Sequence, residues 1–138
     1  MISDIITNLN KEYVKEEPLT VTKGLVHEYL GMPINYIKQL KAQISTLKYI
    51  CKILDEAPKI FNSTYVTPEE NHLFEVNKKG NKLDENEREI SHHFVEKVLF
   101  LTNRARQDIK NTVLFLCTRV KSPDQDNWKK LGRMIRYL

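Results

Sequence analysis

The sequence predicts an α+β fold, with a small mixed α/β part over residues 1–44 packed on a mainly helical part over residues 45–138. Two observations lead to this prediction. Apolar residues recur at helical spacing near the start of the chain and again through most of its second half. Between these regions, short segments with valine, threonine, glycine and proline are typical of strands and turns. A chain of 138 residues can bury enough surface for one compact unit.

The first part begins with a predicted amphipathic helix from Ser3 to about Lys15, which Pro18 ends. The segment Leu19–Val26, with Lys23-Gly24 in its middle, predicts a strand, a turn and a second strand. The apolar stripe of the helix consists of Ile2, Ile5, Ile6, Leu9 and Tyr13.

The segment His27–Tyr36 is predicted to be extended as well. Gly31 and Pro33 within it indicate a close backbone approach or an edge strand rather than a helix. Residues Ile37–Ile44 are ambiguous, because their apolar residues alternate as in a strand while Lys, Gln and Ala favour helices. A strand is the preferred interpretation.

The second part is predicted to contain at least four helices with apolar stripes. Ser45 is expected to cap the first, which Pro58 ends. The segment Thr67-Pro68-Glu69-Glu70 has a capping-box pattern and predicts a further, short helix. The stripe of the first helix consists of Leu47, Ile50, Cys51 and Leu54.

Three longer helices complete this part. Asp84 and Glu87 predict a capping box for one, Asp108 is expected to cap the next, and Ser122-Pro123-Asp124-Gln125 repeats the capping-box pattern for the last. The residues expected in the core are Phe94, Leu101, Val113, Leu116, Trp128, Leu131 and Ile135.

Composition limits the classes of function. A net charge of +4 and a pI near 9.0 are compatible with a polyanionic partner but do not require one. Cys51 and Cys117 are too few for a disulfide framework, which favours a reducing compartment and core cysteines. Because neither a membrane-length apolar run nor a signal peptide is found, we expect an intracellular protein, cytoplasmic or nuclear, without a membrane partner.

No pattern of catalytic or metal-binding residues stands out. His92 and His93 are adjacent, so on a helix they point about 100° apart and cannot share one ion. Acidic pairs such as Asp55-Glu56 lie at predicted helix ends, where capping and the helix dipole explain them. We therefore predict neither a metal site, a cofactor nor catalytic residues in this chain.

A set of short motifs occurs in a particular order. These are HEYLGMPI (His27–Ile34), STLKYICKIL (Ser45–Leu54), Thr67-Pro68, HFVEKVLFL (His93–Leu101), RARQDI (Arg104–Ile109), VLFLCTRVKSP (Val113–Pro123) and DNWKKLGRMIRYL (Asp126–Leu138). In this order the chain resembles the reverse transcriptase of copia-type LTR retrotransposons. The resembling region lies between the catalytic Asp-Asp hairpin and the ribonuclease H domain, so residues 1–44 would be a palm remnant and residues 45–138 a thumb and connection.

Three departures from the family qualify what the resemblance implies. Gln107 stands where the family has proline, and Ile37–Ile44 lacks the turn glycine and β-branched residues expected of its second strand. The family's Tyr-x-Asp-Asp hairpin, which holds magnesium in the complete enzyme, would precede Met1, and the sequence contains no Asp-Asp pair. We therefore expect no polymerase activity from this chain. The helix over Asp124–Leu138 has no stop signal, and a ribonuclease H domain is expected to follow it.

The resemblance implies contributions to template–primer binding. Tyr29, Leu30, Gly31 and Met32 would correspond to the primer grip, although Gly31 is equally explained as a packing glycine. The basic residues between Lys97 and Arg136 outnumber the acidic ones, as phosphate binding to an RNA–DNA or DNA duplex requires. Arg106 is the exception, because it could instead pair with Asp108. The residues selected for nucleic-acid binding on the last helix are Lys129, Lys130, Arg133 and Arg136.

Three functions remain open from the sequence. The chain is interpreted as a fragment of an RNA-directed DNA polymerase that works with upstream polymerase and downstream ribonuclease H segments of the same element. The alternatives are a stand-alone helical module that binds protein or RNA, and a non-functional relic that still folds.

Overall fold

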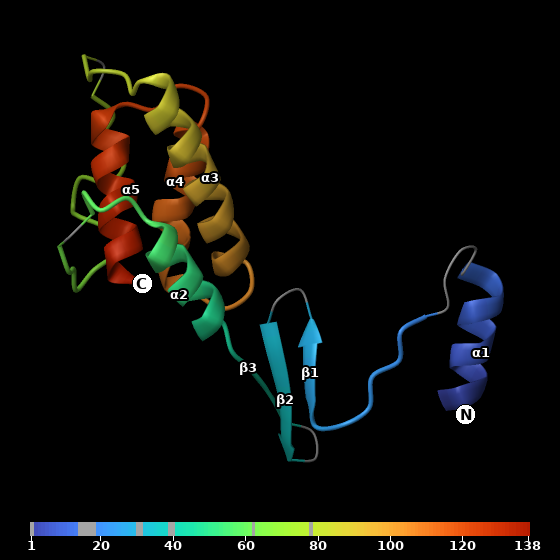
Figure 1. Cartoon of the computed structure of the whole chain (residues 1–138). Coiled ribbons are helices and arrows are strands. Elements are labelled where there is room, and N and C mark those ends of the chain that lie inside the picture. Colours follow the sequence, from blue (N-terminus) through green and yellow to red (C-terminus); the bar gives the residue numbers. More distant parts are fainter. Residues whose placement is uncertain (1, 14–18, 30–31, 39–40, 62, 78) are drawn as a thin grey trace. The chain divides into compact units, whose positions relative to one another are not determined.

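The structure is a computed structural model that describes residues 2–13, 19–29, 32–38, 41–61, 63–77 and 79–138. The chain divides into two compact units, Met1–Ile44 and Ser45–Leu138. The described residues form five α-helices, one short 3-10 helix and one three-stranded antiparallel sheet (Figure 1). The predicted α+β class is confirmed.

The first unit contains helix α1 (Ile2–Tyr13) and strands β1 (Val26–Tyr29), β2 (Met32–Lys38) and β3 (Lys41–Ile44). The strands are joined in sequence order, with β2 in the middle. The first helix and the extended conformation of Ile37–Ile44 are therefore as predicted wherever these segments are described. Pro18, which was predicted to end the helix, lies outside the described residues.

Two predictions for the first unit are wrong. Leu19–Val26 does not form two strands, because the chain bends at Gly24, whose φ of +132° suits glycine, and pairing begins only at Val26. The segment His27–Tyr36 is extended where it is described, as predicted, but Pro33 lies in the middle strand, so the edge-strand alternative is wrong for this residue. The ladder between β2 and β3 starts at Ile34, so at Pro33 only β1 pairs with β2. Because β3 does not pair with β2 at Pro33, the missing N–H of this proline removes no ladder hydrogen bond, as on an edge strand.

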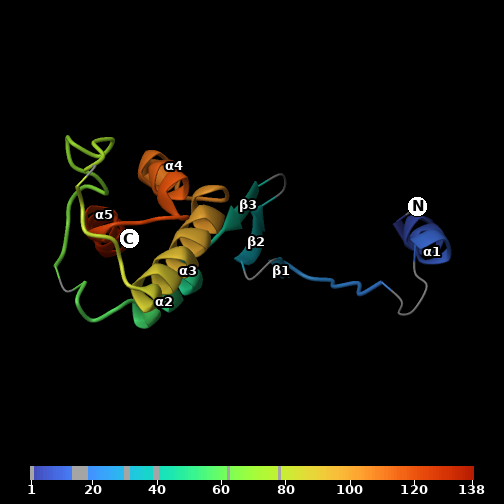
Figure 2. The same cartoon turned by 90° about the horizontal axis from the view of Figure 1, so that it is seen from above.

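The second unit is a helical bundle. It contains α2 (Leu47–Glu56), α3 (Glu85–Thr102), the 3-10 helix η1 (Gln107–Ile109), α4 (Lys110–Arg119) and α5 (Gln125–Tyr137). Helix α5 packs against α2, α3 and α4, and α3 also packs against α4 (Figure 2). The last helix is thus the element that holds the bundle together.

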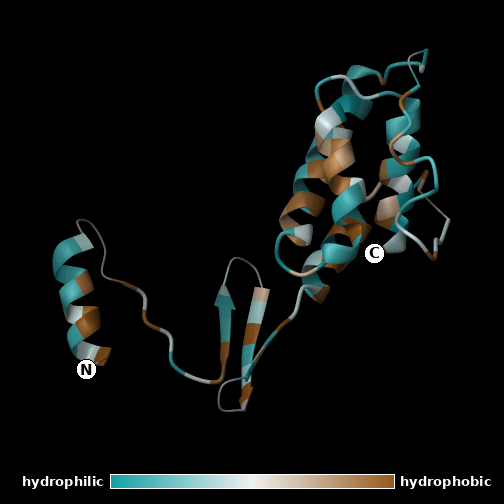
Figure 3. Ribbon diagram, turned by 180° about the vertical axis from the view of Figure 1, so that it is seen from behind, coloured by the Kyte–Doolittle hydropathy of each residue, from teal (hydrophilic) through white to brown (hydrophobic). Residues whose placement is uncertain are grey.

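The apolar core lies within this bundle. All seven residues predicted for the core are buried, with Val113, Leu131 and Ile135 fully inaccessible. Figure 3 shows the apolar residues in brown on the bundle helices, next to teal hydrophilic residues on the same helices. Because α5 alone contributes Trp128, Leu131, Met134 and Ile135 to this core, its apolar face is fixed by packing.

Two helix starts follow the predicted chemistry. Asp84 caps α3, and its side chain and that of Glu87 form a complete capping box. Asp124 caps α5 in the same way with Asn127, whose backbone N–H donates to Asp124 Oδ1 at 2.9 Å. The N-cap of α5 is therefore Asp124, two residues after Ser122, at which the predicted capping-box pattern begins.

Three other predicted starts are wrong. Residues 66–68 form a bend and residues 71–74 a turn instead of a helix, and the Glu70 carboxylate pairs with Arg133 rather than closing a cap. Asp108 does not cap α4, since its carboxylate pairs with Arg106 and η1 precedes the helix. Thr46 rather than Ser45 stands at the N-cap of α2, although the Ser45 hydroxyl accepts a hydrogen bond from the backbone N–H of Leu47 at 3.4 Å, whereas the Thr46 side chain makes no capping bond.

The apolar stripe of α2 also differs from the prediction. Ile50 and Ile53 are buried, whereas Leu47 is 66% exposed. Cys51 is exposed and Cys117 half-buried, so the expectation of two core cysteines is wrong. Burial raises the pKa of the Cys117 thiol.

Residues 57–84 connect α2 to α3 and, where described, contain neither helix nor ladder strand. A connection of this length is uncommon in a compact domain and is usually functional or a linker. Phe61 and Leu73 anchor it in the bundle core, with side chains 8% and 3% exposed. The connection therefore lies against the bundle as a structured part of it, beside α5.

Candidate nucleic-acid interface

The basic residues of α5 are divided between two faces of the helix. Lys129, Arg133 and Arg136 follow one another at spacings of four and three residues, so they share one face. These three residues, called here the α5 basic stripe, also line one hollow together with residues of the connection. Lys130 is offset from the stripe, and the structure separates it from the other three.

Lys130 is buried rather than presented to solvent. Its side chain is 9% exposed, and its Nζ donates to the Glu75 carbonyl oxygen at 2.8 Å and pairs with Asp126 Oδ2 at 2.7 Å. The ammonium group also lies 4.8 Å from the ring centroid of Phe115. The expectation that Lys130 lies on an open basic face is wrong, because the 69–76 segment covers it. Its observed role is to hold that segment.

Arg133 is likewise engaged with the connection. Its Nη1 pairs with Glu70 Oε1 at 2.6 Å and its Nη2 donates to Thr67 Oγ1 at 3.0 Å. The guanidinium stacks on Tyr65, 4.4 Å from the ring centroid. Such a fork of two hydrogen bonds and one aromatic face uses the geometry that distinguishes arginine from lysine.

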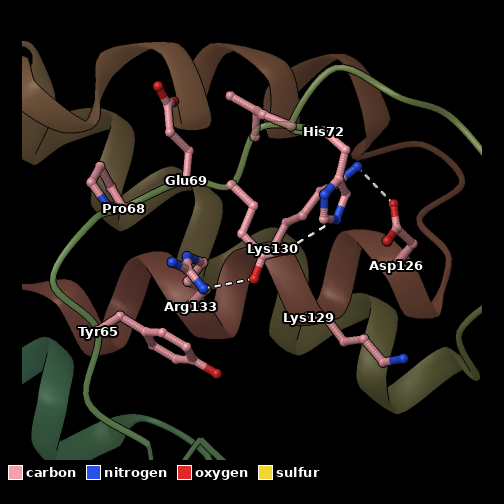
Figure 4. Close-up of a pocket in the computed structure, with 10 residues that line it drawn as sticks. Tyr65, Pro68, Glu69, His72, Asp126, Lys129, Lys130 and Arg133 are labelled. Carbon is pink, nitrogen blue, oxygen red and sulfur yellow. Dashed lines mark hydrogen bonds and ion pairs between the residues drawn. The ribbon is translucent and has the colours of Figure 1, made fainter.

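A polar cavity of about 210 Å³ lies between the connection and α5 at this point (Figure 4). Two ion pairs line it: Lys130 with Asp126, both on α5, and Arg133 with Glu70, which joins α5 to the connection. His72 adds a further contact to Glu70, at 3.0 Å. The charges inside this cavity are thus largely neutralised by one another.

Lys129 and Arg136 are different. Lys129 is exposed, and in Figure 4 its ammonium group lies apart from the ion pairs. Arg136 is half-buried, and its Nε is shielded from solvent without a hydrogen-bond partner among the described residues. Neither cation is paired with a carboxylate of the part of the chain that the structure describes. These two residues are the available cations of the α5 basic stripe.

The other basic residues between Lys97 and Arg136 also fall into two groups. Lys97 pairs with Glu56, which lowers the pKa of that carboxyl group, and Arg106 pairs with Asp108 at 2.7 Å. Of the two roles open to Arg106, the structure thus shows the ion pair. No carboxylate partner appears within the described ranges for Arg104, Lys110, Arg119 and Lys121.

The predicted primer-grip residues lie in the first unit. Tyr29 ends β1 with a side chain 61% exposed, and Met32 begins β2 with a side chain only 5% exposed. The two residues are paired across the antiparallel ladder. Leu30 and Gly31 lie outside the described residues. Of the two described residues, Tyr29 is the accessible one.

Metal ligands do not converge in the part of the chain that is described: no group of three or more His, Cys, Asp or Glu residues is placed to hold an ion. His92 lies 3.3 Å from Glu96 and His93 lies 3.8 Å from Glu56. The two imidazoles therefore turn to different partners, as their spacing predicts.

Sequence patterns missed the residues of the connection that shape the site. Phe61, Tyr65 and Glu70 belong to a stretch without helical or strand periodicity, so nothing in their spacing indicates that they meet α5. Gly132 carried a usable signal, because an isolated glycine in a helix often marks a close packing contact.

None of the helices that the structure describes has the length and apolar character needed to cross a membrane. No protein-family model, no curated protein and no solved structure matches the chain.

Proposed function

We propose that the chain binds nucleic acid as part of an RNA-directed DNA polymerase of the copia type, holding the template–primer duplex while other segments carry the chemical step. The observation that carries this proposal is how the charged residues between Lys97 and Arg136 are paired. Asp108 and Asp126 are engaged in ion pairs and Asp124 in the α5 cap, whereas six basic residues have no carboxylate partner among the described residues. They are Arg104, Lys110, Arg119, Lys121, Lys129 and Arg136.

Unpaired cations on rigid helices suit a polyphosphate backbone. Each contact with a phosphate releases condensed counterions, which gives affinity without base recognition. Helix α5 fixes the backbone positions of Lys129 and Arg136 through its buried face, so only their side chains have to be ordered on binding. The proposal also accounts for the ordered motifs that resemble the family's thumb and connection.

The test is binding of a fluorescently labelled RNA–DNA hybrid duplex, followed by anisotropy across a salt series. The decisive variant is Lys129→Gln with Arg136→Gln, which leaves the ion pairs of Lys130 and Arg133 intact. The slope of log affinity against log salt should become shallower by roughly one unit for each lost contact. The matched control is Lys48→Gln with Lys52→Gln, an equal loss of charge on the exposed side of α2.

The expected result is weak, salt-sensitive binding that the α5 variant reduces and the α2 control leaves almost unchanged. Equal effects of the two pairs would point to non-specific attraction by net charge. Absence of binding at low salt would reject the proposal.

A second candidate is a protein-interaction module, which the first unit favours. The apolar residues of α1 are largely accessible, with Ile2 73% and Tyr13 74% exposed. Exposed apolar residues gathered on one helix often mark a contact with another protein. If the duplex fails to bind while the chain self-associates or captures upstream polymerase segments, this second function takes precedence.

A further inference from the structure

The hollow beside the α5 basic stripe adjoins the polar cavity, with which it shares Tyr65, Lys129 and Arg133, but its lining is more apolar. It has a volume of about 320 Å³, within the range of small-molecule sites. Its floor is made by Phe61, Trp128 and Gly132, and the Phe61 and Trp128 rings pack with centroids 4.9 Å apart. Ile60, 71% exposed, forms an accessible part of its wall. Phe61 and Trp128 are only 8% and 7% exposed and their rings are tilted by 51°, so Ile60 supplies most of the accessible apolar surface.

Cations border this apolar surface. Lys129, Arg133 and Arg136 line the hollow against a single carboxylate, that of Glu87, which already accepts from Gln125 at 3.1 Å. The Nε atoms of Arg133 and Arg136 are shielded from solvent and have no hydrogen-bond partner among the described residues. Arg119 Nε, which does not line the hollow, is in the same state, so these shielded atoms do not by themselves indicate a ligand.

From this combination we infer that the hollow between α5 and the residues Ile60, Phe61, Ser63 and Tyr65 binds a single unpaired nucleotide, with its base on the apolar surface and its phosphate at Arg136 and Lys129. The inference rests on the proposed function, which it deepens by assigning a nucleotide site next to the duplex-binding cations. Guanidinium groups match the geometry of phosphate oxygens, and base–aromatic stacking adds affinity without demanding a particular base.

The polar groups of the hollow distinguish a base from a purely apolar anion. Ser63 and Gln125 lie beside the apolar floor and offer hydrogen-bond donors and acceptors. The edge of a base can pair with the exposed Ser63 hydroxyl and with the Gln125 side chain, which already donates to Glu87. A nucleotide thus accounts for the apolar floor, the polar edge and the cationic border together.

Trp128 provides a direct report of occupancy, because it is the only tryptophan in the chain and lines the hollow. The full-length chain is titrated with thymidine 5′-monophosphate, and the fluorescence of Trp128 is recorded with excitation at the red edge of the indole band. Thymidine without phosphate and inorganic phosphate alone are titrated in parallel. We expect a saturable change with the nucleotide and about tenfold weaker binding of thymidine, equal to about 1.4 kcal/mol.

Ile60→Glu is the variant that tests the site. It places a carboxylate at an exposed wall position, where folding tolerates it, and should weaken nucleotide binding by about tenfold or more. Val66→Glu is the matched control, because Val66 is 93% exposed on the same connection and does not line the hollow. The nucleotide affinity of this control should stay within about twofold of that of the unchanged chain, a difference of less than half a kcal/mol.

Failure of this inference is separable from failure of the proposed function. If the hybrid duplex binds but Trp128 does not respond to the nucleotide, or if both glutamate variants respond alike, the nucleotide site is overturned and duplex binding stands. If the nucleotide binds and the duplex does not, the site stands and the duplex function falls.

Discussion

The ring of Phe61 packs directly on the backbone of Gly132, so that a β-carbon at residue 132 would lie 2.5 Å from Cδ1 and 2.6 Å from Cε1 of that ring. This contact joins the connection to the middle of α5. It explains why glycine, a poor helix former, occupies an interior position of a buried helix. The absence of one side chain lets the connection approach α5 closely enough to form the nucleotide-sized hollow.

Gly132→Ala should therefore destabilise the protein. In an unobstructed helix this change would stabilise by up to about 1 kcal/mol, but here the added methyl group overpacks the Phe61 contact. We expect a net loss of about 1–2 kcal/mol in the free energy of unfolding, measured by urea denaturation. Asn111→Ala, on the exposed side of α4, is the control and should be neutral or slightly stabilising. A stabilised Gly132→Ala protein would contradict the close contact.

Trp128→Ala should lower the free energy of unfolding by roughly 3–5 kcal/mol. The indole is only 7% exposed and packs on Phe61, so its removal leaves a large cavity in the core. Trp128→Phe is the matched variant, since it keeps an aromatic ring against Phe61 and should cost clearly less. Equal losses for the two variants would show that the ring contact contributes little.

Asp108→Asn tests a carboxylate of η1 that pairs with Arg106 and accepts a hydrogen bond from Tyr137 at the end of α5. Arg106 first, and then a hydrogen bond donated by the Tyr137 hydroxyl at 2.9 Å, lower the pKa of the Asp108 carboxyl group from 3.8 to about 2. Because the pKa is lower in the folded chain, the stabilisation is present above pH 3.8 and is lost as the pH falls towards 2. The carboxylate is 39% exposed, so solvent screening limits its contribution to about 1 kcal/mol or less.

The measurement compares urea unfolding of the variant and the unchanged chain at neutral pH and near pH 2. The difference between them should be present at neutral pH and shrink in acid. Asp55→Asn, an exposed change on α2, serves as the control. A difference that persists unchanged at low pH would mean that the Asp108 charge is not its cause.

The sequence patterns succeeded where a single local rule governs the outcome. The spacing of Val113 and Leu116, and of Trp128, Leu131 and Ile135, identified buried faces because helical periodicity and burial coincide there. Asp84 with Glu87 was identified because both members of that capping box are local. The capping rule failed at Thr67, because Glu70 pairs with Arg133, and at Asp108, because its carboxylate pairs with Arg106.

The candidate site could be predicted less well from such patterns. Lys129 and Lys130 are neighbours of the same chemical type, yet one is exposed and the other is 9% exposed beneath residues 69–76. The difference depends on where the connection lies, and that path is set by the contacts of Phe61 and Leu73 with the core. No periodicity encodes these contacts. Charge alone therefore overestimated the open basic surface of α5.

The last prediction concerns the two units. Met32 is the one buried apolar residue among the described residues of Met1–Ile44, whereas the whole core cluster belongs to Ser45–Leu138. Since burial of apolar surface is the main source of stability, a chain of residues 45–138 should fold by itself. Its melting temperature should lie within about 4 °C of that of the full chain, a shift equivalent to less than about 1 kcal/mol for a domain of this size.

Circular dichroism on both chains provides the measurement, with Trp128→Ala introduced into each as an internal standard. If the helical unit is autonomous, that substitution lowers the stability of both chains by the same amount, because distant and independent changes are additive. A shortened chain that unfolds without cooperativity, or in which Trp128→Ala has a much smaller effect, would show that residues 1–44 contribute to the stability of the bundle.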